Sequence, residues 1–277
     1  MIQNTHSEQE QLSSSLLAST RAGMEINLTQ CQLRYLDNEA PLFSNLNLHL
    51  PKGKWSCILG KSGCGKTSLL RLLAGLLDSQ ATWHGQLTTD NDTVLSEQVA
   101  YMAQQDLLLP WLSVLENVCL SLRFNQVQTD KAAQDKAHQL LVLVGLSEYI
   151  HARPNQLSGG MRQRVALART LMQDKPVVLM DEPFSALDAV TRHKLQTLSA
   201  KLLKGKTVLL ITHDPQEALR LGDQLLLMSS ANARSDKKAA SQIVTLPVPQ
   251  TVPPRDFSAE LAEHHQQIIE RLEQDYA

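Results

Sequence analysis

The chain has 277 residues, of which 43% are hydrophobic and 19% are charged, so it can bury one large core or two smaller ones. Its formal net charge of −2 gives no support for a general grip on nucleic acid, which needs a basic surface. The cysteines form no CxxC pair and have no metal-ligand spacing, so we interpret them as reduced thiols of a cytosolic protein. They are Cys31, Cys57, Cys64 and Cys119.

The amino end is polar and contains many serine and glutamine residues. Residues 1–23 have no basic segment followed by an apolar run, so they do not predict a secretory signal. We expect them to form a disordered, solvated tail. No segment of the chain is apolar for long enough to cross a bilayer.

The first folded elements are predicted to be strands. Apolar and polar residues alternate over Glu25–Tyr35 and again over Asn45–Leu50, as they do in half-buried strands. Pro51-Lys52-Gly53 then predicts a turn. The apolar segment Trp55–Leu59 favours a short buried strand, and Thr67–Leu77 favours an apolar helix.

A glycine-rich loop joins that strand to that helix. Its residues, Gly60-Lys61-Ser62-Gly63-Cys64-Gly65-Lys66-Thr67, fit the phosphate-binding pattern of a glycine, four residues and then Gly-Lys-Thr. Backbone N–H groups and the helix N-terminus would face a polyanionic phosphate. Lys66 would reach the β- and γ-phosphates, and the Thr67 hydroxyl would ligate Mg²⁺.

A second anion site is predicted in the middle of the chain. Strands are expected at Trp83–Thr89 and Val99–Met102, and helical periodicity extends over residues 113–146. Leu157-Ser158-Gly159-Gly160-Met161-Arg162-Gln163 then leads into an apolar helix, Val165–Met172. Taken alone, this segment is better interpreted as a simple helix cap with flexible glycines. Because a nucleotide has one γ-phosphate, two anion sites favour a dimer that holds each nucleotide between two subunits.

From Pro176 onward, strands and helices alternate, which predicts an α/β fold with a parallel sheet wrapped by helices. The expected elements are Val177–Met180, Ala189–Leu203, Thr207–Ile211 and Pro215–Leu221. The first strand ends in Asp181 and Glu182, at the edge where α/β sheets bind ligands. Asp181 would hold Mg²⁺, and Glu182 would orient and polarise the attacking water. On its own, the carboxylate pair is equally consistent with capping of the next segment, since Pro183 follows.

In this order, the motifs resemble those of the ATP-binding subunits of ABC transporters over about residues 24–230. Gly60–Thr67 resembles the Walker A loop, Leu157–Gln163 the signature motif, and Val177–Glu182 the Walker B strand with its catalytic glutamate. Ser185-Ala186-Leu187-Asp188 resembles the D-loop, and Thr212-His213-Asp214 the segment of the switch histidine. The resemblance implies an ATP hydrolase with a P-loop NTPase (RecA-like) core. It also implies an N-terminal antiparallel β subdomain and an inserted helical subdomain at about residues 105–165.

The resemblance also implies roles for single residues. Gln104 would contact Mg²⁺ and water, and it is preferred over the adjacent Gln105 because it lies six residues before Pro110. Tyr35 would stack on adenine, with an ordinary half-exposed strand tyrosine as the alternative. His213 would sense the γ-phosphate. Ser68 would complete the nucleotide site, and Asp188 would contact the partner subunit across the dimer interface. Thr67, Gln104 and Asp181 would together hold the metal.

Two further segments are interpreted locally. Asp214, Pro215 and Glu217 predict a helix cap, a first helical position and a capping box. Leu107-Leu108-Leu109-Pro110-Trp111-Leu112 is an apolar loop, which would be costly if it were exposed. It would either pack in the core of the helical subdomain or form a groove for a coupling helix of a membrane subunit.

The Leu-Pro-Trp sequence resembles one importer group, which imports nitrate, sulfonates, taurine or pyrimidine precursors of thiamin. We expect residues 231–277 to form a linker and a C-terminal helical extension, with an amphipathic helix at Ala259–Leu272. The implied partners are a second copy of the chain, integral-membrane permease subunits and, indirectly, a periplasmic or extracellular substrate-binding protein. The implied location is peripheral, on the cytoplasmic face of the plasma membrane.

The alternative is an ABC-family ATPase that is not coupled to transport. A DNA-repair member would usually carry a long coiled coil between Lys66 and Ser158, where only about ninety residues without sustained heptads occur. A translation factor would carry two ATPase domains. An exporter would usually have fused membrane helices, and a non-enzymatic subunit would be expected to lack Lys66, Glu182 or His213.

Overall fold

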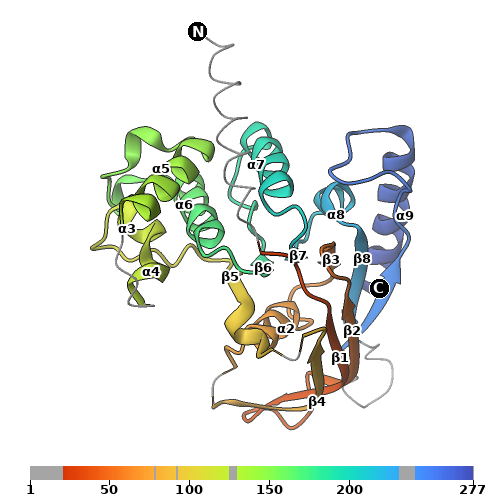
Figure 1. The fold of residues 1–277 in the computed structure, drawn as a ribbon. Coiled ribbons are helices and arrows are strands. Elements are labelled where there is room, and N and C mark those ends of the chain that lie inside the picture. The colour runs from red at the N-terminus through yellow and green to blue at the C-terminus, as the bar shows by residue number, and fades with distance from the viewer. Residues whose placement is uncertain (1–20, 78, 92, 125–129, 231–240, 277) are drawn as a thin grey trace.

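The computed structural model describes residues 21–77, 79–91, 93–124, 130–230 and 241–276. Most of the expected N-terminal tail, residues 1–20, lies outside the described residues. Next to it, the Gly23 N–H donates a 2.8 Å hydrogen bond to the Gly205 carbonyl. The fold contains a three-stranded sheet, a six-stranded sheet and a helical layer at one side (Figure 1).

The N-terminal sheet is antiparallel and has the strand order β2-β1-β4. Its strands are β1 (Ile26–Tyr35), β2 (Phe43–Leu50) and β4 (Ala81–Thr89). Every second residue of β2 from Leu46 to Leu50 is buried, which is the alternation that predicted it. The expected antiparallel β subdomain is therefore confirmed.

The central sheet has the order β5-β6-β7-β3-β8-β9. It consists of β5 (Val99–Met102), β6 (Val177–Asp181), β7 (Thr207–Ile211), β3 (Trp55–Leu59), β8 (Gln224–Ser230) and β9 (Ser241–Leu246). All neighbouring pairs are parallel except β8 and β9. Every residue of β3, β6 and β7 is buried, as expected for a parallel sheet covered on both faces.

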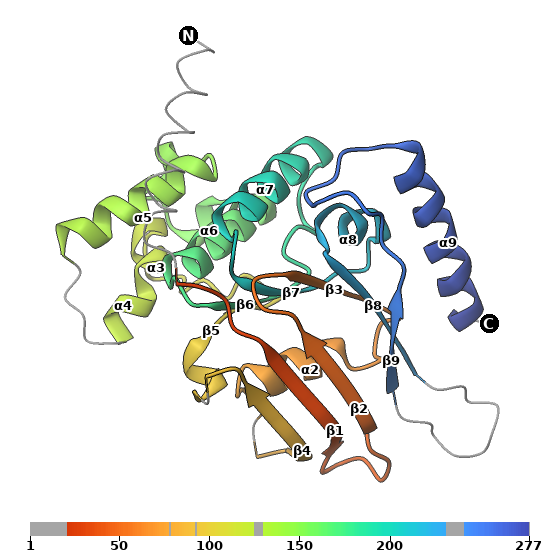
Figure 2. The ribbon, with the colours of Figure 1, turned by 45° about the vertical axis from the view of Figure 1, so that its right-hand side comes forward.

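Helices cover both faces of the central sheet (Figure 2). Helix α2 (Lys66–Leu73) lies between the two sheets, while α6 (Gly159–Met172), α7 (Ala189–Leu202) and α8 (Pro215–Leu221) cover the opposite face. The helical layer contains α3 (Val114–Val118), α4 (Leu120–Phe124) and α5 (Lys131–Leu143), which pack with α6. Helix α9 (Ala259–Tyr276) packs on α8. Short 3₁₀ turns occur at Leu95–Gln98, Ser147–Tyr149 and Pro154–Gln156.

The two faces of β3 point into two different cores. Cys57 and Leu59 pack into the core that contains the helical layer and α6 to α9. Ile58 packs into the other core, with α2 and the N-terminal sheet. Burial of both faces fixes the register of this strand, because a slip by one residue would exchange the two sets of side chains.

Several elements differ from the sequence-based predictions. Helix α2 ends at Leu73 instead of Leu77, because Gly75 adopts a φ of 69° and the Leu76 N–H turns back to the Arg71 carbonyl, as in a Schellman cap. Helix α6 begins at Gly159, six residues before the expected start. Strand β8 was not predicted, and neither was β9, since residues 231–277 were expected to hold only a linker and a helix.

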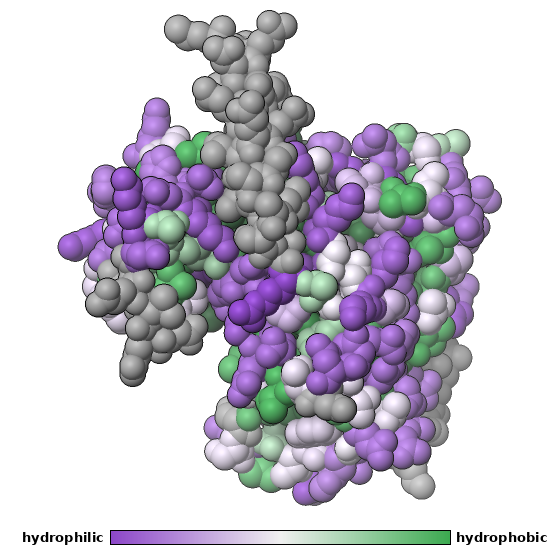
Figure 3. Space-filling model, in the orientation of Figure 1, coloured by the Kyte–Doolittle hydropathy of each residue, from purple (hydrophilic) through white to green (hydrophobic). Residues whose placement is uncertain are grey.

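The face of the molecule in Figure 3 is mostly polar. On this face, apolar residues form scattered patches separated by polar ones. Among the helices of the described residues, none has the length and apolar content that a membrane span requires.

An anchored arginine joins the segment before α9 to α8. Arg255 is 5% exposed, and its guanidinium donates to the carbonyls of Leu219, Gly222, Thr251 and Pro249 at 2.6–3.1 Å. The arginine thus supplies donors to four carbonyl acceptors at the end of α8 and in the segment before α9.

We expect Arg255→Ala to lower the free energy of unfolding by about 2–3 kcal/mol, because buried carbonyls lose their donor. Urea titration followed by circular dichroism measures it. Arg271→Ala, at an exposed position of α9, is the control and should change the value by less than about 0.5 kcal/mol. Equal small losses in both variants would contradict the anchoring role.

Candidate functional site

The candidate site lies at the carboxyl ends of three adjacent parallel strands. β3 leads into the glycine-rich loop, β6 ends at Asp181, and β7 leads into Thr212 and His213. The order β6-β7-β3 therefore brings three segments that are distant in sequence to one edge of the sheet, where α/β folds bind ligands.

The glycine-rich loop packs tightly on its inner side. Gly60 has a φ of 152°, and a Cβ at this position would lie 2.1 Å from the Met228 carbonyl oxygen, so no other residue fits without a shift of β8. Lys66 is 9% exposed, and its Nζ donates to the carbonyls of Gly60 (2.7 Å) and Lys61 (2.9 Å). The ammonium is thus held against the loop that would cradle phosphates.

A cavity of about 370 Å³ opens in front of this loop. It is lined by Tyr35, Asn38, Leu42, Ser62, Gly63, Gly65, Lys66, Thr67, Ser68, Gln104, Asp181 and Glu182. Its volume lies in the range of small-molecule sites. It therefore brings most of the expected nucleotide-binding residues together with the two carboxylates and Gln104, whereas Gly60, Lys61 and Cys64 do not line it.

The Thr67 hydroxyl donates a 2.7 Å hydrogen bond to Oδ2 of Asp181, which joins α2 to the end of β6. Burial raises the pKa of Asp181, and the hydrogen bond from Thr67 opposes this effect. A divalent cation would favour the charged carboxylate. Hydroxyl, carboxylate and amide oxygens are the donors that Mg²⁺ prefers, so Thr67, Asp181 and Gln104 fit the expected metal.

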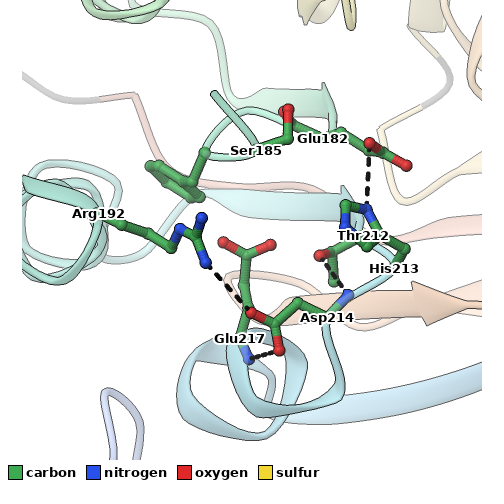
Figure 4. A pocket seen from close by; sticks show the side chains of 8 residues that line it. Glu182, Ser185, Arg192, Thr212, His213, Asp214 and Glu217 are labelled. Atoms are coloured by element: carbon green, nitrogen blue, oxygen red, sulfur yellow. Dashed lines mark hydrogen bonds and ion pairs between the residues drawn. The ribbon is translucent and has the colours of Figure 1, made fainter. Parts of the chain in front are cut away.

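Glu182 is the centre of the polar contacts at this edge. Its Oε2 lies 3.2 Å from Nδ1 of His213 (Figure 4) and accepts a 3.3 Å hydrogen bond from Nε2 of Gln104. The structure therefore places Gln104, and not Gln105, beside this carboxylate. Both Gln104 and His213 are exposed enough to meet a ligand from solvent.

The backbone of Glu182 is strained and held in place. Its φ of 48° is unfavourable for a residue with a side chain. The Glu182 N–H donates to the Ile211 carbonyl at 2.9 Å, and the Glu182 carbonyl accepts from the side chains of Gln163 and Ser185, both at 3.0 Å. These bonds fix the direction in which the carboxylate points.

Tyr35 is half-buried, and its hydroxyl lies 2.9 Å from the Ser68 hydroxyl. It lines the cavity from β1, on the side of the N-terminal sheet. The contact with Ser68 thus positions the ring of Tyr35 beside the glycine-rich loop.

The Ser-Gly-Gly segment forms the start of α6. Ser158 caps the helix by accepting a hydrogen bond from the Met161 N–H at 3.3 Å. Gly159, Arg162 and Gln163 line a second cavity of about 390 Å³, together with Gln104, Gln105, Asp106, Leu107, Ser185 and Ala186. No described residue of Leu157–Gln163 lines the cavity of the glycine-rich loop. Within one chain, the two predicted anion sites are separate.

Gln163 has a function that the sequence did not reveal. Its side chain is 6% exposed, and it accepts from the Ala186 N–H while donating to the Glu182 carbonyl, both at 3.0 Å. It is therefore directed into its own chain, where it braces the loop after β6. Arg162 is likewise engaged within the chain, by a 3.0 Å ion pair with Asp106.

The segment Ser185–Asp188 lies against the start of α6. A Cβ on Gly160 would come within 3.1 Å of the Ala186 carbonyl, so the two backbones are in close approach. Asp188 caps α7 by accepting from the Thr191 N–H at 3.0 Å, and this bond lowers the pKa of its carboxyl. Leu187 is buried.

The expected capping box at α8 is only half present. Asp214 accepts from the N–H groups of Gln216 and Glu217, as predicted. The Glu217 side chain is instead buried and accepts a 2.9 Å hydrogen bond from Nε2 of Gln196. The prediction for Glu217 was wrong because a buried amide on α7 offers this carboxylate a better donor than the cap backbone.

Part of the apolar loop Leu107–Leu112 packs in the core, and part of it is exposed. Leu108 is buried in the core, whereas Leu107 and Trp111 are 59% and 65% exposed. The buried amide of Asn117 fixes the turn through the carbonyls of Leu109 and Leu112. Arg169 holds the Leu107 carbonyl at 2.9 Å. The exposed apolar side chains are thus displayed by a rigid loop.

Ser241 is a second residue that the sequence did not reveal. At the start of β9, its hydroxyl donates a 2.7 Å hydrogen bond to the Cys64 carbonyl, on the inner side of the glycine-rich loop. The two residues are 177 positions apart, and no motif surrounds Ser241.

Comparisons with known proteins agree with this geometry. Residues 43–185 match the family model described as ABC transporter. The chain is 42% identical over 236 residues to an uncharacterized ABC transporter ATP-binding protein of Haemophilus influenzae, covering 85% of this chain and 94% of that one. It is 40% identical to an aliphatic sulfonates import ATP-binding protein of Pectobacterium atrosepticum (83% and 81% covered). It is 43% identical to a taurine import ATP-binding protein of Pseudomonas fluorescens (74% and 77% covered).

Two solved structures have a similar fold. One is a dimeric bacterial ABC transporter cassette, with a TM-score of 0.65 and 33% identity, covering 73% of this chain and 93% of that chain. The other is a dimeric post-hydrolysis state of an ATP-binding cassette bound to ADP and Pi, with a TM-score of 0.66 and 30% identity, covering 84% and 100%.

The parallel core with its phosphate-binding loop defines a P-loop NTPase fold. The chain belongs to the ABC transporter family, and like the ATP-binding proteins of that family it is an ATPase.

Glu217 makes the stability of the protein depend on pH. Burial raises the pKa of this carboxyl, the hydrogen bonds from Thr212 and Gln196 oppose the rise, Asp214 adds to it, and Arg192 opposes it. Above pH 4.5 the unfolded chain has released this proton while the native chain still holds it, so rising pH favours unfolding until the native pKa is passed.

Glu217→Gln should remove this decline, because an amide keeps the bond to Gln196 and does not titrate. The urea midpoint, measured from pH 4.5 toward neutrality, should fall less for the variant than for the native protein. Glu263→Gln, at an exposed position of α9, should follow the native profile. Identical profiles for Glu217→Gln and the native protein would contradict the assignment.

Proposed function

We propose that this chain is the ATP-binding and ATP-hydrolysing subunit of an ABC importer, which energises the uptake of a small solute through a separate permease. The observation that carries the proposal is the convergence of Gln104, Glu182 and His213 beside the glycine-rich loop, in a chain of this family. The import proteins among its relatives support the direction of transport.

The nucleotide site is completed by a second copy of the chain. The glycine-rich loop lines one cavity of the chain and Gly159, at the start of α6, lines another, although both segments have N–H groups suited to phosphate. In a head-to-tail dimer, the loop of one subunit and Ser158-Gly159-Gly160 of the other would hold one ATP between them. The dimeric state of the similar cassettes supports this arrangement.

Each side chain of the site then has a defined task. Lys66 binds the β- and γ-phosphates, and Tyr35 packs against the base. Thr67, Asp181 and Gln104 would hold Mg²⁺, which neutralises phosphate charge when it is bound. Glu182 orients and polarises the water that attacks the γ-phosphorus, and His213 contacts the γ-phosphate from the end of β7.

ATP hydrolysis would be coupled to transport through the charge of the bound nucleotides and the closure of the dimer. Two bound ATP molecules draw the subunits together, and their closure moves the attached permease between inward- and outward-facing states. Hydrolysis and phosphate release remove the charge that held the dimer shut. The exposed Leu107 and Trp111 form the surface on which a coupling helix of the permease docks.

We assign the transported solute to the nitrate, sulfonate, taurine and thiamin-precursor pyrimidine class. The support is the Leu109-Pro110-Trp111 sequence together with the names of the sulfonate and taurine import relatives. The binding protein for this solute would meet the permease on the outer side of the membrane. This chain would meet the permease on the cytoplasmic face, as a peripheral protein.

Glu182→Gln should bind ATP with native affinity and hydrolyse it at least about 100-fold more slowly, because the amide cannot accept a proton from the attacking water. Steady-state phosphate release at saturating MgATP measures turnover, and titration calorimetry measures affinity. Glu263→Gln is the matched control and should keep native turnover. Turnover of Glu182→Gln within a few-fold of the native rate would remove Glu182 from this role.

A further inference from the structure

Arg192, in the first turns of α7, connects two loops of the site. Its Nη2 donates a 3.0 Å hydrogen bond to the carbonyl of Leu187, and its Nη1 lies 3.7 Å from Oδ2 of Asp214. Leu187 belongs to the segment Ser185–Asp188, whereas Asp214 directly follows His213. Figure 4 shows the guanidinium pointing from α7 across to the Asp214 side chain. One side chain thus touches the loop after β6 and the loop after β7.

The two helices that follow these loops, α7 and α8, are joined by hydrogen bonds of Gln196, one turn after Arg192. Gln196 on α7 donates to Glu217 on α8 at 2.9 Å and accepts from Nε of Arg220 at 3.2 Å. All three side chains are buried, at 4–7% exposure. Buried side-chain hydrogen bonds therefore join α7 to α8 at this level, and Arg192 joins the segments at their first turns.

Nearer the site than Gln196, the two loops meet where Oε2 of Glu182 lies 3.2 Å from Nδ1 of His213, and beside this contact a gap lies between them. This gap is a cavity of about 40 Å³, lined by Glu182, Phe184, Ser185, Arg192, Thr212, His213, Asp214 and Glu217. This volume can hold water, and the lining is polar. Nε of Arg192 is buried and has no hydrogen-bond partner among the described residues. The guanidinium of Arg192 is therefore a second direct link between the loops, in addition to the contact between Glu182 and His213.

We propose that Arg192 is a positioning residue, which sets the distance between the Ser185–Asp188 loop and His213 during ATP hydrolysis. The inference deepens the proposed function and rests on it, because Asp188 would face the partner subunit while His213 faces the γ-phosphate of its own subunit. A displacement of the His213 segment, when phosphate leaves, is transmitted through Asp214 and Arg192 to the loop that meets the partner.

The geometry calls for an arginine. A guanidinium is planar and presents N–H groups in two directions, so Nη1 and Nη2 serve Asp214 and Leu187 at the same time. A lysine ammonium at the same position could keep the charge, but it could not hold both partners in fixed directions. Neither contact involves the glycine-rich loop, so the affinity for ATP does not depend on Arg192.

The test is a double-mutant cycle on ATP hydrolysis by the full-length chain. Arg192→Gln should lower kcat about tenfold and leave the KM for ATP within about twofold of the native value. Asp214→Asn keeps a helix-capping side chain at α8 but removes the negative charge, and it should lower kcat in the same way. Because both changes break one link, the double variant should be no slower than the slower single variant.

Lys194→Gln removes a positive charge from an exposed position of the same helix and should keep native kcat and KM. If Arg192→Gln fails to bind ATP, and so has not folded, Arg192→Lys replaces it, with the same loss in kcat at constant KM.

A kcat of Arg192→Gln within twofold of native, a loss that appears in KM, or effects that multiply in the double variant would each overturn the inference. Absence of ATP hydrolysis by the native chain would instead refute the proposed function, and the inference would fall with it.

Discussion

The parallel pairing of β6, β7 and β3 is the constraint on which the rest of the structure depends. All fifteen residues of these three five-residue strands are buried, so the apolar cores on both faces fix their register. Once that register is fixed, the glycine-rich loop, Asp181 and His213 must emerge at the same edge of the sheet. The hydrogen bond from Thr67 to Asp181 then closes the loop onto β6. The site is thus a consequence of strand order.

Distant side chains hold the backbone of the site in conformations that it would not adopt alone. Glu182 has a positive φ, and Gln163 on α6 secures its carbonyl. Ser241 on β9 secures the inner side of the glycine-rich loop at Cys64. If Glu182 has the role proposed for it, a carboxylate held in this way needs little reorganisation when the substrate arrives. The cost of the strain is offset by the packing of the two cores.

The sequence predicted the parts of the fold that depend on local patterns. The apolar segments at β3, β6 and β7 and the glycine-rich loop are visible because burial and phosphate binding each restrict residue type locally. β9, the inward turn of Gln163 and the bond from Gln196 to Glu217 could not be predicted, because each depends on a partner that lies far away in the sequence. Glu217 illustrates the limit: its spacing from Asp214 suits a capping box, but a buried donor on α7 decides its direction.

In one chain, the starts of α2 and α6 line separate cavities, and the central claim is that a second copy brings them together on one nucleotide. Light scattering of Glu182→Gln with saturating MgATP tests this claim most directly, both for the chain alone and for its assembly with the permease. The account predicts a mass of two chains with ATP and one chain without nucleotide when the chain is alone, and two closed copies per permease assembly. A chain that stays monomeric with saturating ATP in both preparations would contradict it.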